Sequence, residues 1–306
     1  MTPRRRAHKT VAVTPAERSP TVRRRRLARL LTDLREQAGL SPAEAARELE
    51  WATTTVHRIE AGTRGTSAGN VIQMLELYGS RGAPVTEDLR REMVQLAKDA
   101  RKRGWWVGYG LDDSFALYVG LETEAAALQT YQVELIHGLL QTEAYARTLR
   151  RAGLPAADPD EIDRWVAVRM RRQRRLTGED PLALWVILSE AALRRQVGGP
   201  EVMTEQLRSL TERAELPNVT LQVLPFAAGP HPAVDSPFSV LTFTERTDQA
   251  VVYVETATEN LYLEDPQVVG WHTLAFNHLR ALALPPSESV VKIQSIIQEI
   301  GSGVDE

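Results

Sequence analysis

The chain is 306 residues long, and 43% of its residues are hydrophobic and 25% charged, so it can bury ordinary globular cores. This length predicts about two domains. No cysteine is present, which excludes disulfides, thiolate metal sites and a cysteine nucleophile. No apolar run is long enough to span a bilayer, and no apolar segment follows the basic N-terminal residues, so we expect a cytoplasmic protein.

The total charge hides two parts of opposite sign. Residues 1–110 contain 21 Lys and Arg against 12 Asp and Glu, whereas residues 111–306 contain 16 against 28. A basic segment joined to an acidic one is typical of a polyanion-binding module attached to another domain. Two arginine clusters, Arg4–Arg6 and Arg23–Arg26, are compatible with a solvated arm and equally with an arm that follows phosphates. We expect residues 1–22 to form a disordered basic arm.

Residues 23–80 have the pattern of an all-helical domain. Leucines at every third or fourth position predict a first helix, and Ser41 and Glu44 form a capping-box pattern that starts the second. The expected helices are one that ends at Gly39, then 41–49, 53–60, one that carries Val71 and Tyr78, and 87–102. The last of these lies in 81–104, which we interpret as a linker helix between two domains.

Residues 105–306 mix helical and strand patterns. Expected helices cover 121–150, 160–176, 189–197, 200–214, 265–283 and 287–300. Expected strands cover 182–188, 219–223, 238–244 and 250–256, and the polar turn 245–249 makes the last two a hairpin. The sequence therefore predicts an α+β protein: an N-terminal all-α domain, then a larger C-terminal domain with a small β-sheet flanked by helices.

The two short helices over 41–49 and 53–60 predict a helix-turn-helix. Such a unit places the start of its second helix in the major groove of DNA, where side chains meet base edges. The candidate DNA-binding residues of this helix are Thr53, Thr54, Thr55 and, one turn after the first, His57. Thr hydroxyls can donate to or accept from bases, and His57 can donate to a guanine or a phosphate.

Residues around this helix are candidates for contacts with the DNA backbone. Ser41 begins a helix whose free N–H groups and dipole favour an anion, so we expect it to face a phosphate. Arg64, in the loop after the third helix, and Asn70 can hold the adjacent backbone.

The stretch over 34–62 resembles the Cro/phage-repressor, or xenobiotic-response-element, type of helix-turn-helix. The residues that match are Leu34-Arg35, Gly39-Leu40-Ser41, Ala46, Val56, His57-Arg58, Glu60 and Gly62. The resemblance implies base-reading roles for Thr53, Thr54 and His57. The chain departs from the family at Pro42, at Glu50 in the turn and at Ala52 in the helix cap. Arg58 either contacts phosphate or pairs with Glu60 or a neighbour.

Nearly the whole chain from about residue 27 resembles WhiJ-like regulators of actinobacteria. The segments that carry the resemblance are WW at 105–106, YVGLETEA at 118–125, HGLLQTEAYAR at 137–147, the run over 169–195 and NVTLQVLPFAAGPH at 218–231. The resemblance implies an antitoxin-like C-terminal domain of poorly known function and a small acidic partner protein encoded by a neighbouring gene. Members usually have a proline where this chain has His137.

Other features of the acidic half are less specific. The basic run Arg169–Arg175 is compatible with a second DNA contact, but we favour a solvated helix face or a dock for an acidic partner. Tryptophans can line an aromatic ligand pocket, but we expect cores to hold them; they are Trp105, Trp106, Trp165, Trp185 and Trp271. His272 and His278 are six residues apart, which is not metal-ligand spacing, and we expect no metal or cofactor.

These patterns predict a sequence-specific DNA-binding transcriptional regulator of the cytoplasm, associated with the nucleoid. Its C-terminal domain would bind a partner protein or a small-molecule effector and hold a homodimer together, because palindromic half-sites in double-stranded DNA need a two-fold axis. The alternatives are an antitoxin-like interaction hub controlled by the small neighbouring-gene partner and, less favoured, a catalytic C-terminal domain. We expect no enzymatic activity.

Overall fold

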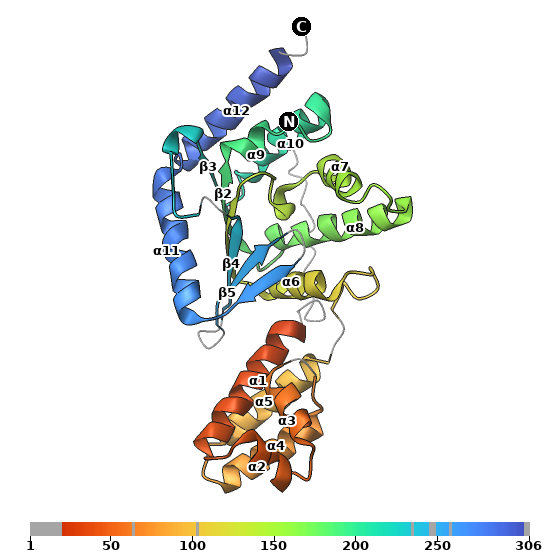
Figure 1. Cartoon of the computed structure of the whole chain (residues 1–306), viewed down its shortest axis with the longest axis vertical. Coiled ribbons are helices and arrows are strands. Elements are labelled where there is room, and N and C mark those ends of the chain that lie inside the picture. Colours follow the sequence, from red (N-terminus) through yellow and green to blue (C-terminus); the bar gives the residue numbers. More distant parts are fainter. Residues whose placement is uncertain are drawn as a thin grey trace, which may run out of the picture. The chain divides into compact units, whose positions relative to one another are not determined.

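The structure is a computed structural model of the chain (Figure 1). It describes residues 20–62, 65–101, 104–233, 236–244, 249–256 and 259–302. Three sequence predictions lie outside these residues: the basic arm up to residue 19, Arg64, and most of the turn over 245–249. Contacts between residues divide the chain near residue 107 into two compact units, which we call the helical unit and the C-terminal unit.

The helical unit contains five helices in its described residues. They are α1 (Pro20–Gln37), α2 (Pro42–Glu48), α3 (Thr53–Glu60), α4 (Ala68–Ser80) and α5 (Glu87–Asp99). Each helix contributes side chains to one core, among them Leu31, Ala45, Ile59, Leu75 and Met93. Burial of this shared core holds the short helices, which would be marginal alone.

Helix α5 is part of the helical unit, although we expected 81–104 to be a linker. Met93 and Ala97 are fully buried in the same core as the leucines of α1. Thr86 caps the helix, because its hydroxyl oxygen accepts the N–H of Leu89 at 3.2 Å. The apolar stripe of this segment predicted a helix but not the surface against which it packs.

Helix α1 begins at Pro20, so Arg23–Arg26 lie on a helix and not in an extended arm. Arg26 Nη2 is 2.6 Å from Glu92 Oε1, and Arg23 Nη1 is 3.6 Å from Asp99 Oδ2. Both carboxylates belong to α5. Part of the positive charge of this cluster therefore fastens α1 to α5.

The C-terminal unit is a six-stranded mixed sheet flanked by helices, which confirms the predicted fold class (Figure 1). The strands are β1 (Ala127–Gln132), β2 (Ala183–Ser189), β3 (Val219–Leu224), β4 (Phe238–Thr242), β5 (Val251–Glu255) and β6 (Asn260–Leu263). Their order is β3-β2-β1-β4-β5-β6. Strands β1 to β3 are parallel, and β4 to β6 are antiparallel to their neighbours. The expected hairpin pairing of β4 with β5 is present.

Helices cover both faces of this sheet. They are α6 (Asp113–Glu124), η2 (Gly138–Leu140), α7 (Glu143–Gly153), α8 (Pro159–Arg172), η3 (Gln173–Leu176), α9 (Glu190–Arg194), α10 (Gly199–Arg213), η4 (Phe226–Ala228), α11 (Pro266–Leu282) and α12 (Pro286–Ser302). Because side chains alternate along a strand, Ile187 and Val240 pack on one face, in a core with Phe276 of α11. Figure 1 shows α11 on that side and α6 and α8 on the other.

The prediction of a helix over 121–150 is wrong for much of its length. Helix α6 ends at Glu124, and β1 then runs between β2 and β4 inside the sheet. The sequence of β1, ALQTYQ, has no strong alternation, and Leu128 and Thr130 are buried only because distant strands flank them. Pairing between segments far apart in the chain decides this strand, so a local pattern could not reveal it. The short strand β6 was not predicted either.

Among the described residues, no helix is both long enough and apolar enough to cross a bilayer. The same part of the chain contains no group of three or more His, Asp or Glu side chains arranged to hold a metal ion.

Candidate functional site

A tight turn joins α2 to α3. The N–H of Leu49 donates to the carbonyl of Ala45 at 3.0 Å, and that of Trp51 donates to Ala46 at 2.8 Å. Between them Glu50 has a φ of 57°, in the left-handed region that favours glycine. The turn therefore forms without the usual glycine, at a conformational cost of about 1 kcal/mol.

Helix α3 has a buried side and an exposed side within the helical unit. Val56 and Ile59 are 0% and 4% exposed and belong to its interior, as predicted. The exposed residues of the helix are Thr53, Thr54, His57 and Arg58. These positions are spaced i, i+1, i+4 and i+5, so they form one continuous face. Thr55 is half-buried beside it.

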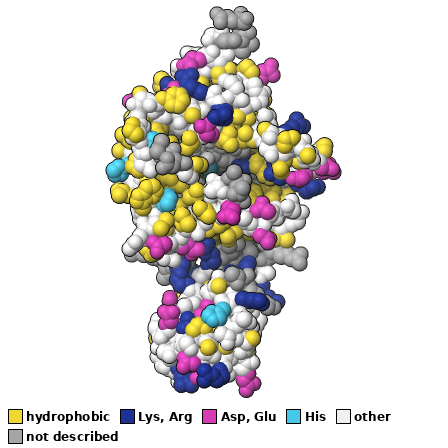
Figure 2. Space-filling model, viewed as in Figure 1, with side chains coloured by type: hydrophobic (Ala, Val, Ile, Leu, Met, Phe, Trp, Pro, Cys, Tyr) yellow, Lys and Arg dark blue, Asp and Glu magenta, His cyan; other side chains and the backbone are white. Residues whose placement is uncertain are grey.

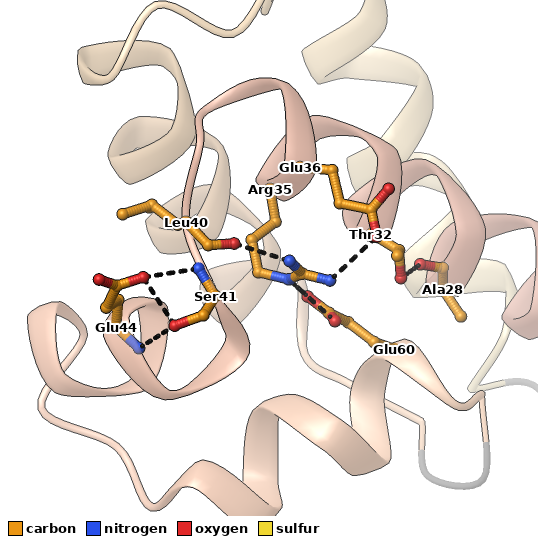
Figure 3. A network of polar contacts seen from close by, with 8 residues as sticks. All are labelled: Ala28, Thr32, Arg35, Glu36, Leu40, Ser41, Glu44 and Glu60. Carbon is orange, nitrogen blue, oxygen red and sulfur yellow. Dashed lines mark hydrogen bonds and ion pairs between the residues drawn. The ribbon is translucent and has the colours of Figure 1, made fainter.

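A buried ion pair holds the end of α3 against α1 (Figure 3). The side chains of Arg35 and Glu60 are only 7% and 8% exposed. Arg35 Nε donates to Glu60 Oε1 at 2.8 Å and Oε2 at 3.1 Å, and Nη1 donates to the carbonyl of Leu40 at 2.7 Å. Burial alone would lower the pKa of Arg35, but the hydrogen bonds and charge of Glu60 outweigh it and raise this pKa. One arginine thus fixes α3 and the start of α2.

Ser41 is the N-cap of α2, and its polar groups already have partners (Figure 3). The Glu44 carboxylate accepts the N–H of Ser41 at 2.8 Å and its hydroxyl at 2.6 Å. In return, Ser41 Oγ accepts the N–H of Glu44 at 3.3 Å, which completes the predicted capping box. The hydrogen bonds of Ser41 lower the pKa of Glu44. A phosphate at Ser41 would have to displace this carboxylate.

Thr55 and Asn70 line one hollow of the helical unit, with a volume of about 430 Å³. Its other lining residues include Ser67, which caps α4 by accepting the N–H of Asn70 at 3.0 Å, and Arg101. Two residues predicted separately are thus brought together beside the N-terminus of α4. The third residue predicted for backbone contacts, Arg64, lies outside the described residues.

The basic run Arg169–Arg175 of the C-terminal unit is not a solvated face. Arg172 is 3% exposed and donates two hydrogen bonds to the buried Glu122, at 2.7 and 2.6 Å. Arg175 donates to the carbonyls of Ala125 and Asp180 at 2.8 and 2.6 Å. The local sequence pattern does not reveal this role, because the partners lie up to 50 residues away in the chain.

His137 adjoins this buried pair. Its Nδ1 accepts the N–H of Leu139 at 3.3 Å, and its Nε2 is 3.4 Å from the hydroxyl of Tyr118. Burial lowers the pKa of His137 to about 3, so the ring is neutral, and with Nδ1 as acceptor the proton is on Nε2. Burial opposes ionisation of Glu122, but the charge and hydrogen bonds of Arg172 hold its pKa below the ordinary value. Burial also raises the pKa of Tyr118.

Comparison with known protein families finds two separate matches, one on each side of the boundary between the two structural units. A helix-turn-helix domain family matches residues 26–89, and a family described as a domain of unknown function, DUF5753, matches residues 115–295. No curated protein and no solved structure matches the chain. A helix-turn-helix domain suggests DNA binding, whereas the role of the second domain is unknown. Because the second match covers more than half of the chain, the protein belongs to the DUF5753 family, with a helix-turn-helix domain before the family domain.

Proposed function

We propose that the protein is a sequence-specific DNA-binding transcriptional regulator of the cytoplasm and nucleoid. The observation that carries the proposal is the exposed face of α3, with Thr53, Thr54, His57 and Arg58 side by side. A helix of this width fits the major groove, and hydroxyl and imidazole groups can discriminate bases there. The finer resemblance of residues 34–62 to Cro/phage-repressor regulators supports the same reading of this face.

Backbone contacts would come from both sides of α3. Thr55 and Asn70 meet in the hollow at the start of α4, where N–H groups and the helix dipole favour a phosphate. Ser41 is a weaker candidate, because the Glu44 carboxylate takes up its donors. Arg64 remains a prediction from the sequence.

The protein would bind DNA as a homodimer, because one short helix reads few base pairs. Helix α11 of the C-terminal unit offers apolar surface for such an interface. Trp271, Leu274 and Leu282 are 52%, 57% and 43% exposed, and their spacing places them on one side of the helix. Exposed apolar groups of this size favour an interaction surface.

The C-terminal domain would bind a small effector or a partner protein. The resemblance to WhiJ-like proteins favours an antitoxin-like hub and a small acidic partner from a neighbouring gene as the second candidate. A stoichiometric small protein that co-purifies with the chain and abolishes its DNA binding would favour this hub.

A catalytic C-terminal domain is less favoured, although several buried groups with shifted pKa values lie close together. General acid–base catalysis works best when a pKa lies near the working pH. The pKa values of Glu122 and His137 are lowered, and that of Tyr118 is raised, so each moves away from neutrality. These directions favour a fixed binding environment over proton transfer, and we propose that the protein is not an enzyme.

A genome-wide footprint of the full chain, followed by gel shifts on the sites found, tests this function. We expect discrete sites with two related half-sites, and an affinity that falls steeply as salt is raised. Arg64→Ala should weaken binding to all sequences alike. Uniform binding along the genome, with no preferred site, would refute the proposal.

A further inference from the structure

A cavity of about 530 Å³ opens in the C-terminal unit, and all its lining residues belong to that unit. Its walls come from α6, α7, α8, the segment around η2, and the ends of β4 and β5. This volume is typical of sites for small molecules. The aromatic side chains of its wall are Phe115, Tyr118, Trp165, Phe238 and Tyr253.

Arg169 stands in this wall without an acidic partner. Among the described residues, no carboxylate oxygen lies within 4.0 Å of its guanidinium, and its buried Nε has no hydrogen-bond partner. The guanidinium carbon lies 4.2 Å from the ring centroid of Trp165, which orients the group by a cation–π contact. Burial and the neighbouring Arg172 lower the pKa of Arg169 to about 9, so the side chain still carries its charge at neutral pH.

Gly138 leaves the space that Arg169 occupies. A Cβ atom at residue 138 would lie 2.0 Å from Arg169 Nη1. Since a Cβ atom does not come this close to a non-bonded nitrogen, any side chain at this position would push the guanidinium aside. The absence of a side chain at Gly138 therefore leaves room for the guanidinium beside the ring of Trp165.

The other arginines of the wall are neutralised. Arg172 is paired with Glu122, and Arg150 Nη2 is 2.8 Å from Glu161 Oε1. Arg169 has no such close pair: Glu255 of the same wall attracts its charge, but no oxygen of that carboxylate lies within 4.0 Å of the guanidinium. Two further buried atoms on residues of the same wall have no hydrogen-bond partner: Arg172 Nη1, which is a donor, and Gln141 Oε1, which is an acceptor. Buried polar atoms in native proteins are normally bonded, so such a cluster is typical of a site whose partner is a ligand.

We propose that the C-terminal domain binds a small organic anion, with its carboxylate or phosphate group on Arg169 and its apolar body against the aromatic side chains of the cavity. An arginine offers such groups two parallel hydrogen bonds, and its low hydration favours pairing in a partly buried site. The proposal names the class of effector for the proposed regulator. The ligand's role as an effector rests on the proposed regulatory function, whereas its binding to the cavity does not.

The test measures binding of defined probes to the full chain by isothermal titration calorimetry at constant ionic strength. The probes are naphthalene-2-carboxylate, 2-naphthyl phosphate and the neutral naphthalene-2-carboxamide. We expect at least one of the anions to bind with saturation, and the amide to bind at least about tenfold more weakly. The anion that binds more tightly identifies the head group as carboxylate or phosphate.

Arg169→Gln should lower the affinity of that anion at least about tenfold, and so should Gly138→Ala, which keeps the charge but displaces it. Arg164→Gln removes the same charge from an exposed position of α8 and should leave binding unchanged. Thermal unfolding of each variant shows whether the domain is intact, and Arg169→Gln removes no ion pair among the described residues, so it should fold.

The proposal is overturned if neither anion saturates the protein, if the amide binds as well as the anions, or if Arg169→Gln binds as tightly as the natural chain. Gel shifts on the same samples report separately on the regulator. Anion binding without any DNA binding would refute the proposed function and support the ligand site. DNA binding without anion binding would refute the ligand site and support the proposed function.

Discussion

Removing Arg35 should destabilise the helical unit far more than removing an exposed arginine. In Arg35→Met, Glu60 loses two charged hydrogen bonds at 2.8 and 3.1 Å, and the carbonyl of Leu40 loses a donor at 2.7 Å. Both side chains of the pair are more than nine-tenths buried, so water cannot replace the lost partner. Breaking a buried pair in this way costs about 3–5 kcal/mol.

That cost is a large part of the stability of a domain this small, which is about 5–15 kcal/mol in total. A loss of 3 kcal/mol corresponds to a fall in the melting temperature of more than about 12 °C for a domain of this length. It also corresponds to amide exchange about a hundredfold faster, wherever exchange follows global unfolding of the unit.

Hydrogen–deuterium exchange resolved by peptides measures this change in the full chain, because peptides of the C-terminal unit serve as an internal reference. Arg81→Met is the matched control, since the pair of Arg81 with Glu48 is 50% and 32% exposed and should contribute little. The double variant Arg35→Met/Glu60→Leu should recover most of the loss, because no charge is left buried alone. Equal effects of Arg35→Met and Arg81→Met would refute this account of how α3 is held.

Three further predictions concern the C-terminal unit. His137 has a pKa lowered from 6.5 to about 3 by burial, so its contribution to stability is present above pH 6.5 and is lost as the pH falls; about 2 kcal/mol should disappear between pH 7 and 5. His137→Gln should flatten this part of the stability curve in urea unfolding, and an unchanged slope would contradict it. The pKa of Glu122 is lowered in the folded protein, so its ionised form contributes stability above the unfolded-state pKa near 4.5, and this stability is lost at lower pH. Glu122→Gln should remove this acid-dependent loss. It should also cost about 3–5 kcal/mol at pH 7, because Arg172 is left buried without its partner. Finally, Leu274→Glu should shift the protein from dimer to monomer in light scattering, and an unaltered mass would exclude the α11 face as the dimer interface.

Local patterns in the sequence predicted the elements that short-range forces decide. The capping box at Ser41, the inward Val56 and Ile59, and the strongly apolar strand β2 all follow from residues a few positions apart. The exposed side of α3 follows directly, because a helix that buries one side must expose the other.

Interactions between distant segments account for the features that local patterns did not predict. Strand β1 is buried between strands more than 50 residues away, and Glu60 is paired with an arginine 25 residues earlier. The run Arg169–Arg175 looks hydrophilic, yet Arg172 is buried because Glu122 lies opposite it in the fold. The cavity around Arg169 is likewise formed by segments spread over 140 residues, and Trp165 was expected in a core although it lines this cavity.

The central claim is that the exposed face of α3 reads the sequence of DNA. The most direct measurement compares the affinity of the full chain for its preferred site and for sites with single base changes, in the natural chain and in Thr54→Ala and His57→Ala. Each variant should lose discrimination at one or two positions, by about 1–3 kcal/mol, while its affinity for unrelated DNA stays nearly the same. Gln95→Ala, an exposed change on α5, should alter neither affinity. If Thr54→Ala and His57→Ala both keep the full sequence preference of the natural chain, α3 is not the recognition helix.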